Sequence, residues 1–324
     1  MRIFVAGASG AIGKHLVPLL VGSGHEVVAT TRSERKAADL RARGAQPVIL
    51  DVLDAEAVGR VVSKAAPEVI VHQATALAET GTHLRNFDKA FAQTNRLRTT
   101  GTANLLAAAR GVDVKTFVAQ SYGGWPYARE GGPVKTEDDP LDPRPPSDAT
   151  ESLAAIRQLE ERVVGAEWLE GIALRYGSFY GPGTSLSHGG EAEEAVRKRK
   201  FPIIGSGAGL WSFAQIEDAA RATLAAIERG RRGLYNVVDD EPAPVSEWLP
   251  YLARQVGAKP PRHVPLWLGK LLVGEQLVSM MTETRGASNA KAKRELGWQP
   301  LYTSWREGFV SGLGEREGEL RTAA

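Results

Sequence analysis

The first fourteen residues join an apolar segment to a helical pattern through three spaced glycines, and this junction constrains the fold more than any other segment. Residues 3–6 are apolar and typical of a buried strand, and Gly7, Gly10 and Gly13 follow them. Apolar residues then recur at helical spacing over 12–20. In such a junction the backbone N–H groups and the positive end of the helix dipole meet a pyrophosphate. The junction predicts a dinucleotide site; the alternative is a Gly-rich turn that binds nothing.

The glycines of this junction have separate expected roles. Gly7 allows a tight exit from the strand, Gly10 lets the backbone approach the phosphates, and Gly13 lets the helix lie against the sheet. We expect cofactor contacts from the whole turn, namely from Gly7, Ser9, Gly10, Ala11, Ile12 and Gly13.

Composition excludes several classes of function. The chain has 324 residues and a formal net charge of +2, which gives no electrostatic reason to expect nucleic acid or a membrane surface as partner. It has no cysteine, so thiol nucleophiles and thiolate metal sites are excluded. Its six histidines, His83 among them, show no metal-ligand spacing. With no signal-peptide pattern and no apolar run of transmembrane length, a cytoplasmic protein is expected.

Short apolar runs alternate with helical patterns along the first half of the chain. This alternation predicts an α/β fold with a doubly wound parallel sheet, and ligand at the carboxyl ends of its strands. The expected strands are 25–30, 47–50, 69–73, 116–120 and 171–176, and the expected helices are 33–43, 55–65, 99–110 and 152–164.

The pattern changes near residue 180 to a Gly-rich loop, a basic helix and a later strand. We predict a Rossmann domain over 1–179, which receives a strand near 233–239, and a smaller lobe over 180–324 that mainly binds substrate. The apolar stretch 265–281 is interrupted by charged residues and is interpreted as one or two amphipathic helices that cover a cleft.

Several motifs along the chain resemble those of the extended short-chain dehydrogenase/reductase superfamily, in its NAD-dependent epimerase/dehydratase branch. The likeness spans nearly the whole length and is much more specific for fold than for reaction. Its motifs are GASGAIG at 7–13, DV at 51–52, HQA at 72–74, GTANLL at 101–106, LRY at 174–176, YGPG at 180–183, FAQIED at 213–218 and RELGW at 294–298.

The end of the second expected strand bears on the type of cofactor. In dinucleotide sites an acidic residue about 20 residues past the glycines binds the adenosine ribose, whereas an Arg accommodates a 2′-phosphate. The segment 29–33 has no carboxylate but contains Arg32, with Arg35 and Lys36 close behind. We therefore expect a preference for NADP(H) over NAD(H), the alternative being that these are exposed basic residues of a helix start.

The resemblance implies further cofactor contacts. Asp51, beside Val52, is expected at the adenine amino group, and Gln73, Ala74 and Thr75 are expected beside the nicotinamide ribose. Gln120 and Tyr176 complete the cofactor contacts that the resemblance implies.

The usual catalytic pair of the family is missing. Members carry Tyr-x-x-x-Lys on a helix after the fifth strand, in which the Tyr transfers a proton and the Lys binds the ribose. The best alignment puts Leu153 at the Tyr position and Arg157 at the Lys position. A one-residue shift does not restore the acid, because no residue from Asp148 to Gln158 is Tyr.

Three residues are the candidates for the missing chemistry. Tyr122, at the carboxyl end of a strand, is the most economical replacement acid; the alternative is an aromatic wall with Trp125 and Tyr127. Ser121 either donates to a substrate carbonyl or bonds the local backbone. Arg157 either holds the nicotinamide ribose or is an exposed charge paired with Glu161, and it cannot relay a proton.

The segment before Phe213 departs from the nucleotide-sugar enzymes. The resemblance implies an Arg-Asp pair at this place in nucleotide-sugar enzymes, whereas this chain has Trp211 and Ser212. Exchanging a cation for indole removes a phosphate contact and adds an apolar face, so Trp125 and Trp211 are expected to line a pocket for an apolar substrate. Packing between the lobes is the alternative for Trp211.

These observations favour an NADP(H)-dependent reductase or dehydrogenase that acts on a carbonyl or alcohol of a small, fairly apolar molecule. Tyr122, aided by Ser121, would manage the proton of the oxygen. Two alternatives remain open: a nucleotide-sugar epimerase or dehydratase, and a cofactor-binding sensor or regulator without catalysis. The resemblance also implies a homodimer through helices packed on the sheet.

Overall fold

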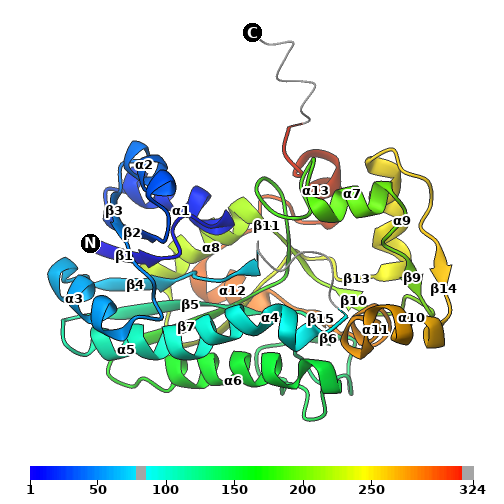
Figure 1. The fold of residues 1–324 in the computed structure, drawn as a ribbon, viewed down its shortest axis with the longest axis horizontal. Coiled ribbons are helices and arrows are strands. Elements are labelled where there is room, and N and C mark those ends of the chain that lie inside the picture. Colours follow the sequence, from blue (N-terminus) through cyan, green and yellow to red (C-terminus); the bar gives the residue numbers. More distant parts are fainter. Residues whose placement is uncertain (78–84, 316–324) are drawn as a thin grey trace, which may run out of the picture.

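A seven-stranded parallel sheet forms the centre of the molecule (Figure 1). The computed structural model describes residues 1–77 and 85–315, and the sheet has the order β12-β7-β5-β4-β1-β2-β3. The predicted doubly wound architecture is confirmed. The strands of this sheet are β1 (Arg2–Ala6), β2 (Glu26–Thr31), β3 (Gln46–Ile49), β4 (Val69–His72), β5 (Thr116–Tyr122), β7 (Glu170–Tyr176) and β12 (Gly233–Val237).

Helices cover both faces of the sheet. One face carries α1 (Ala11–Gly22), α2 (Glu34–Ala42), α8 (Ile216–Arg229) and α12 (Ala290–Leu296). The other carries α3 (Ala55–Ala65), α4 (Phe87–Arg96), α5 (Thr102–Ala109) and α6 (Thr150–Val164), which lie below the sheet in Figure 1. Successive strand residues alternate between these layers: Ile3 and Val5 pack in the first, and Phe4 and Ala6 in the second.

The helical segment that ends in α5 is longer and less regular than the sequence predicts. The structure adds α4, which was not among the expected helices, and connects it to α5 by the π-helical turn η2 (Leu97–Gly101). The expected helix over 99–110 is therefore the end of one helical rod that begins at Phe87. Single π turns inside helices often occur at functional sites.

Residues beyond 180 contribute to both parts of the molecule. Strand β12 pairs with β7, and α8 packs on α1 across the first face. The remaining elements surround a second core that is rich in aromatic side chains, among them Phe213, Trp248 and Trp305. We call this part the C-terminal lobe; the division at residues 179 and 180 stays a prediction. The helices of this lobe are α7 (Glu191–Arg197), α9 (Val245–Gln255), α10 (Leu266–Val273), α11 (Glu275–Thr282) and α13 (Trp305–Ser311), whereas the 3-10 turn η3 (Ser147–Ala149) directly precedes α6.

Short strands in pairs complete this second part. None of them has more than three residues, and among the described residues no helix is long and apolar enough to span a lipid bilayer. The pairs are β6 (Val134–Lys135) with β15 (Gly286–Ala287), β8 (Ser178–Tyr180) with β11 (Phe213–Gln215), β9 (Ile203–Ile204) with β14 (His263–Val264), and β10 (Leu210–Trp211) with β13 (Ala243–Pro244).

Glycine at position 13 sets how closely α1 approaches the chain that leaves β1. A Cβ atom on Gly13 would lie 2.0 Å from the carbonyl oxygen of Ala8, which no relaxation of a side chain can relieve. Gly22, at the other end of α1, has no heavy atom within 4 Å of its corresponding Cβ position. Replacing each of these two glycines by alanine therefore distinguishes the effect of a steric clash on stability from the effect of helix propensity.

We predict that Gly13→Ala lowers the free energy of unfolding by about 1–3 kcal/mol, because the new methyl group overlaps the backbone of Ala8. Gly22→Ala, the matched control, is expected to stabilise the protein by up to about 1 kcal/mol, because alanine loses less entropy in a helix. Urea unfolding of the wild type and both variants measures the difference. Equal midpoints for the two variants would contradict the proposed close packing.

Candidate functional site

One cavity of about 1320 Å³ runs from the glycine junction along the carboxyl ends of the strands into the C-terminal lobe. It brings together predicted site residues that are far apart in the sequence. Those that line it are Gly7, Ser9, Gly10, Ala11, Ile12, Gly13, Arg32, Asp51, Val52, Gln73, Ala74, Thr75, Gln120, Ser121, Tyr122, Trp125 and Trp211. Two predicted site residues, Tyr176 and Arg157, are not part of its lining.

The glycine junction has the geometry of a phosphate cradle. Gly7 adopts a φ of +83°, and a Cβ there would lie 2.6 Å from the backbone of Ala74, so a larger residue is excluded where β1 and β4 end side by side. The backbone N–H of Gly7 donates to Thr30 Oγ1 at 3.2 Å, which fixes the turn against β2. Helix α1 then begins at Ala11 with its N-terminal end beside the cavity. This arrangement fits a dinucleotide, whose pyrophosphate binds at such a helix start.

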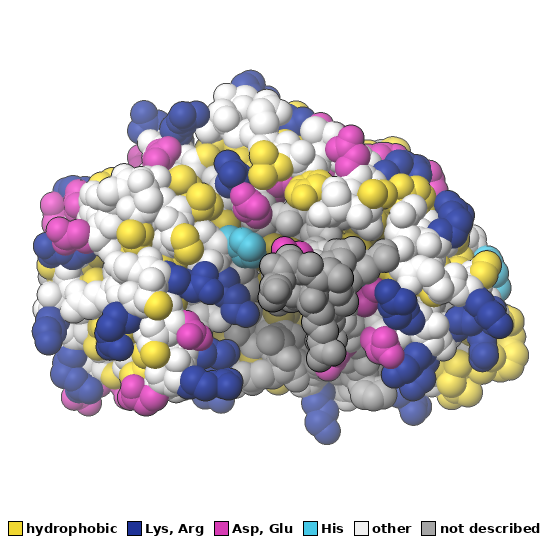
Figure 2. Space-filling view, turned by 90° about the horizontal axis from the view of Figure 1, so that it is seen from above, with side chains coloured by type: hydrophobic (Ala, Val, Ile, Leu, Met, Phe, Trp, Pro, Cys, Tyr) yellow, Lys and Arg dark blue, Asp and Glu magenta, His cyan; other side chains and the backbone are white. Residues whose placement is uncertain are grey.

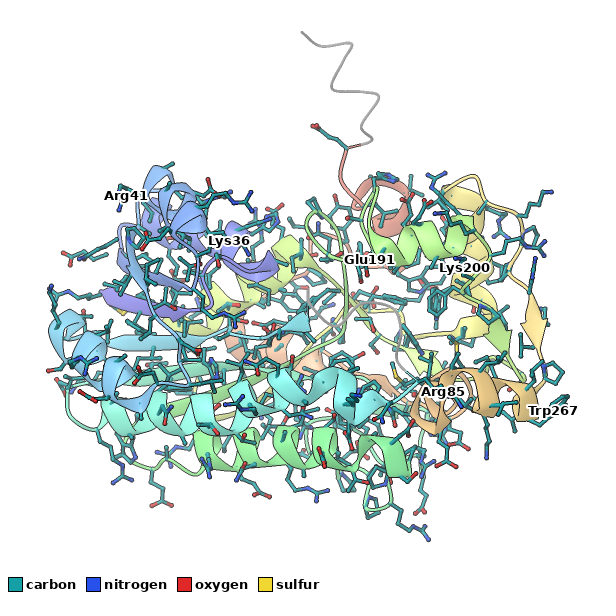
Figure 3. The ribbon with its side chains drawn as sticks, in the orientation of Figure 1. Lys36, Arg41, Arg85, Glu191, Lys200 and Trp267 are labelled. Carbon is teal, nitrogen blue, oxygen red and sulfur yellow. The ribbon has the colours of Figure 1, made fainter. Side chains whose placement is uncertain are left out.

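Basic side chains line the cavity where β2 gives way to α2. Arg32 and Lys36 line it together with Ser33, whose hydroxyl accepts from Lys36 N and caps α2. Arg35 is exposed and does not line the cavity. In Figure 3, Lys36 lies on the side of α2 nearer the C-terminal lobe, whereas Arg41 lies on the outer side. Of the two helpers proposed for Arg32, the structure brings only Lys36 to the site.

Tyr176 is placed behind the cavity wall. It is fully buried, and its hydroxyl lies 2.7 Å from Thr223 Oγ1 and accepts from Gln73 Nε2 at 3.3 Å. Burial raises the pKa of Tyr176 to about 12, so it stays protonated. Tyr176 does not line the cavity, so the direct cofactor contact expected of it gains no support; it is instead hydrogen-bonded to Gln73, which lines the cavity. The Oε1 atom of Gln73 is buried and has no hydrogen-bond partner among the described residues.

Ser121 is tied to a buried ion pair. Its hydroxyl donates to Glu160 Oε1 at 2.6 Å. Glu160 also accepts two hydrogen bonds from Arg175, from Nε at 2.8 Å and from Nη2 at 2.7 Å. Glu160 and Arg175 are 5% and 3% exposed, so this network joins α6 to β5 and β7 in the core. The proton of Ser121 is therefore held by a carboxylate, which favours a structural role over donation to a substrate carbonyl.

The position of Glu160 determines which side of α6 faces inward. Ser152, Ile156 and Glu160, four residues apart, are all buried, whereas Arg157 is exposed. Arg157 lies on the outer surface of the helix and does not line the cavity, so the ribose contact expected of it gains no support. Leu153 is buried, as Ser152 is, so the residue aligned with the family Tyr faces inward while the residue aligned with the family Lys faces outward. None of Ser152, Leu153, Ile156 and Arg157 is a Tyr or a Lys.

Tyr122 lines the cavity and holds a defined hydrogen bond. Its hydroxyl lies 3.0 Å from Ser178 Oγ on β8. Burial raises its pKa, against the opposing effects of the Ser178 hydrogen bond and of the positive charge on Arg98. Gly124 keeps space for the ring, because a Cβ there would lie 2.8 Å from the Tyr122 hydroxyl. Tyr122 is therefore a protonated hydroxyl at neutral pH, able to donate but not to act as a base.

Arg98 is a site residue that the sequence analysis did not single out. It comes from the π-helical turn η2, is 6% exposed and lines the cavity. Burial lowers the pKa of its guanidinium to about 10, although Glu160 and Tyr122 raise it, so Arg98 is a cation at neutral pH. Its Nε atom is buried without a hydrogen-bond partner in the described residues. The sequence did offer a signal, because Arg98 lies three residues before Gly101, where the resemblance to the family implies an Asn.

Aromatic side chains dominate the other half of the cavity. Phe87 packs edge-on against Trp125 with ring centroids 5.3 Å apart and stacks on Phe91 at 4.3 Å. Trp211 lies 5.0 Å from Trp248, and its indole N–H donates to the carbonyl oxygen of Met280 at 2.8 Å. Trp211 thus lines the cavity and packs within the C-terminal lobe, and it also packs against the cluster that contains Phe87 and Trp125. Its role toward a substrate stays a prediction. This half suits a flat, apolar molecule.

The two helices predicted to cover the cleft, α10 and α11, contribute unequally to the cavity wall. Val273, Leu277, Met280 and Met281, at the end of α10 and along α11, line the cavity. The rest of α10 faces outward: in Figure 3, Trp267 lies at the outer edge of the C-terminal lobe, and it is 70% exposed. Hydrophobic side chains gather at this edge in the view of Figure 2. Only the α11 side therefore closes the site.

Metal chemistry gains no support from the described part of the chain. Within residues 1–77 and 85–315, no three His, Asp or Glu side chains come close enough together to hold a metal ion. His83 lies outside the described residues. His72, at the end of β4, is fully buried, and burial lowers its pKa to about 4 while its Nε2 lies 3.1 Å from the carbonyl oxygen of Leu97. It is a neutral core histidine at neutral pH.

Comparisons with known proteins agree with this geometry. Residues 3–238 match the model of the NAD dependent epimerase/dehydratase family. The chain is 44% identical to a 3-diazoavenalumate denitrifying reductase of a Streptomyces species over 95% of this chain and 99% of that protein. It is 29% identical to a 4-hydroxy-2-methyl-3-oxo-4-farnesyl-3,4-dihydroquinoline-1-oxide ketoreductase of Stigmatella aurantiaca, over 80% of this chain and 74% of that protein.

A solved structure shows the same architecture with a cofactor. The UDP-glucose 4-epimerase of Thermus thermophilus, in complex with NAD, superposes with a TM-score of 0.75 at 25% identity, and the match covers 100% of both chains. The family match, the reductase relatives and the phosphate cradle point to the same class of protein. The chain belongs to the NAD-dependent epimerase/dehydratase family and is an oxidoreductase with a nicotinamide dinucleotide cofactor.

Proposed function

We propose that this protein is an NADPH-dependent reductase that removes the nitrogen of a diazo group from a small, flat, apolar substrate. The observation that carries the proposal is the single cavity, in which the phosphate cradle continues directly into walls of Phe, Trp and Met side chains. The Streptomyces relative, named for reductive denitrification of a diazo compound, matches over nearly its whole length and supports this chemistry.

The residues of the cradle would hold the cofactor. The N-terminal end of α1 and the glycine turn would bind the pyrophosphate, and Gln73, whose Oε1 has no partner among the described residues, would bind the nicotinamide half. Bound NADPH supplies a hydride. Arg32 and Lys36 line the part of the cavity where a 2′-phosphate would lie, and the absence of a carboxylate in 29–33 removes the group that usually selects NAD(H).

The proposed reaction needs no general acid, which agrees with the absence of a Tyr-x-x-x-Lys pair on α6. When a diazonium carbon is reduced, the hydride forms the new C–H bond, and dinitrogen leaves with the electrons of the broken C–N bond. No alkoxide forms, so no side chain has to protonate one. Ser152 and Ile156 occupy the inward face of α6, and neither is a proton donor of the Tyr-x-x-x-Lys kind. The walls exclude water and thereby protect a reactive diazo group from hydrolysis.

Ketone reduction is the second candidate, and Tyr122 specifically favours it. Tyr122 lines the cavity, is protonated at neutral pH and is held by Ser178 at 3.0 Å. A carbonyl oxygen placed beside its hydroxyl would receive a proton as hydride reaches the carbon. The Stigmatella relative is named as a ketoreductase, which supports this alternative. A cytoplasmic homodimer remains part of the proposal.

The cofactor preference is tested by binding. We predict that the wild type binds NADPH more tightly than NADH, and that Arg32→Ala and Lys36→Ala each raise the dissociation constant for NADPH roughly 10- to 100-fold, because each loses a charge-assisted contact to the 2′-phosphate. Affinity for NADH should not change. Arg41→Ala, on the outer side of α2, is the matched control (Figure 3). Fluorescence titration measures all affinities; tighter binding of NADH by the wild type refutes the proposal.

The reaction is tested with a benzenediazonium salt and with acetophenone. We predict that NADPH deuterated at C4 transfers deuterium to the arene with release of dinitrogen, faster than in protein-free solution. Tyr122→Phe should leave this rate within a few-fold, because the step needs no proton. The same substitution should lower any ketone reduction roughly 10²- to 10⁴-fold, the usual contribution of a general acid.

Tyr251→Phe, which alters a hydroxyl bonded to the Arg306 carbonyl away from the cavity, is the control for these rates. Product deuteration by mass spectrometry separates enzymatic hydride transfer from solvent chemistry. Unlabelled arene, or no acceleration by the wild type, would rule out denitrification as the activity.

A further inference from the structure

Arg98 carries a buried charge that the protein itself does not neutralise by direct contact. It is 6% exposed, and among the described residues no hydrogen bond or ion pair at contact distance involves its guanidinium. A guanidinium has five N–H donors, and burying them without acceptors is costly. Because Arg98 lines the cavity, the acceptor that is missing from the protein can come from a ligand.

Among the described residues, Arg98 carries an excess positive charge, because no carboxylate makes contact with it. Glu160 is the carboxylate that attracts Arg98, but its oxygens already accept from Ser121 and twice from Arg175. Arg175 is attracted by Glu137 as well as by Glu160, whereas Glu160 is the one carboxylate of the described residues that attracts Arg98, and it makes no hydrogen bond with Arg98. His72, the other titratable neighbour, is neutral at pH 7, since burial lowers its pKa to about 4, and Tyr122 is neutral as well. This corner of the cavity thus favours an anion over a neutral group.

The position of Arg98 along its helix shows what is attached to that anion. Phe87, Phe91 and Arg98 all line the cavity from one helical rod formed by α4 and η2. At about 1.5 Å of rise per residue, Arg98 lies roughly 10 Å along the rod from Phe91. A molecule lying against this wall therefore meets stacked aromatic rings first and a cation at its end.

We propose that Arg98 binds the carboxylate of the substrate, so that the substrate class is an aromatic acid with its ring against the cluster of Phe87, Phe91 and Trp125. This inference rests on the proposed function, in which the substrate occupies the aromatic half of the cavity. The ribose hydroxyls and the amide of the cofactor's nicotinamide half are neutral, so they would not neutralise the positive charge of Arg98.

The test compares an acid with its ester at the NADP⁺-loaded protein. Isothermal titration with cinnamate and with methyl cinnamate should show at least roughly tenfold tighter binding of cinnamate by the wild type, the usual effect of a charge-assisted pair. Arg98→Met should abolish this preference, and Arg98→Lys, which keeps the charge but not the fork of donors, should retain part of it. Arg157→Met, on the outer face of α6, should behave as the wild type.

Other results overturn the assignment. An ester bound as well as the acid by the wild type, or a preference that survives in Arg98→Met, would show that Arg98 does not bind a carboxylate. So would an Arg98→Met protein that loses affinity for NADP⁺ while it keeps the acid-to-ester ratio, since Arg98 would then serve the cofactor. Cinnamate carries no diazo group, so failure of the denitrification reaction leaves this result independent. If Arg98→Met does not fold, the wild-type ratio and Arg98→Lys decide.

Discussion

The buried ion pair between Glu160 and Arg175 is the interaction on which the arrangement of the site depends. Two hydrogen bonds of 2.8 and 2.7 Å join the carboxylate on α6 to the guanidinium on β7, and Ser121 on β5 completes the carboxylate's partners. Removing one member of such a pair leaves an uncompensated buried charge, so α6 cannot rotate away from it cheaply. The pair thereby decides which residues of α6 face the sheet.

The rotation of α6 has a direct chemical consequence. With Glu160 facing inward, Ile156 faces inward one turn earlier and Arg157 faces solvent. The helix that carries a cation in typical relatives thus presents a hydrocarbon side chain instead. The positive charge of this site comes from Arg98, on the π turn of the neighbouring rod. A cation that enters from α4 and η2 shares its wall with Phe87 and Phe91, which ties charge recognition to the aromatic half of the cavity.

The sequence predicted the parts of the site that depend on local pattern. The strand, the glycines and the helix start lie within fourteen consecutive residues, and their close packing requires glycine at 7 and 13 whatever the rest of the chain does. The inward face of α6 could not be predicted in the same way. Glu160 and Glu161 are both acidic, and the sequence alone does not show which of them points into the core. Only the contact of Glu160 with Arg175 distinguishes them.

The π turn at 97–101 could not be predicted from the sequence either. Its hydrogen-bond register is a response to packing between α4, α5 and α6, and no local residue type encodes it. Helix α4 itself has two large apolar residues, Phe87 and Phe91, too few for a clear helical period. Arg98 was visible as a departure from a family position, but its meaning depended on a burial that only the tertiary structure shows.

The state of Tyr122 constrains the direction of any proton transfer in the cavity. Burial raises its pKa, and this effect exceeds the opposing influence of Arg98 and Ser178. A hydroxyl with a raised pKa gives up its proton only to a strong base such as a developing alkoxide, and it cannot accept one at neutral pH. Oxidation of an alcohol needs a base at this place, whereas reduction of a ketone needs an acid and hydride transfer to a diazonium carbon needs neither. A protonated Tyr122 therefore suits the role of proton donor that we propose for it in the reduction of a ketone.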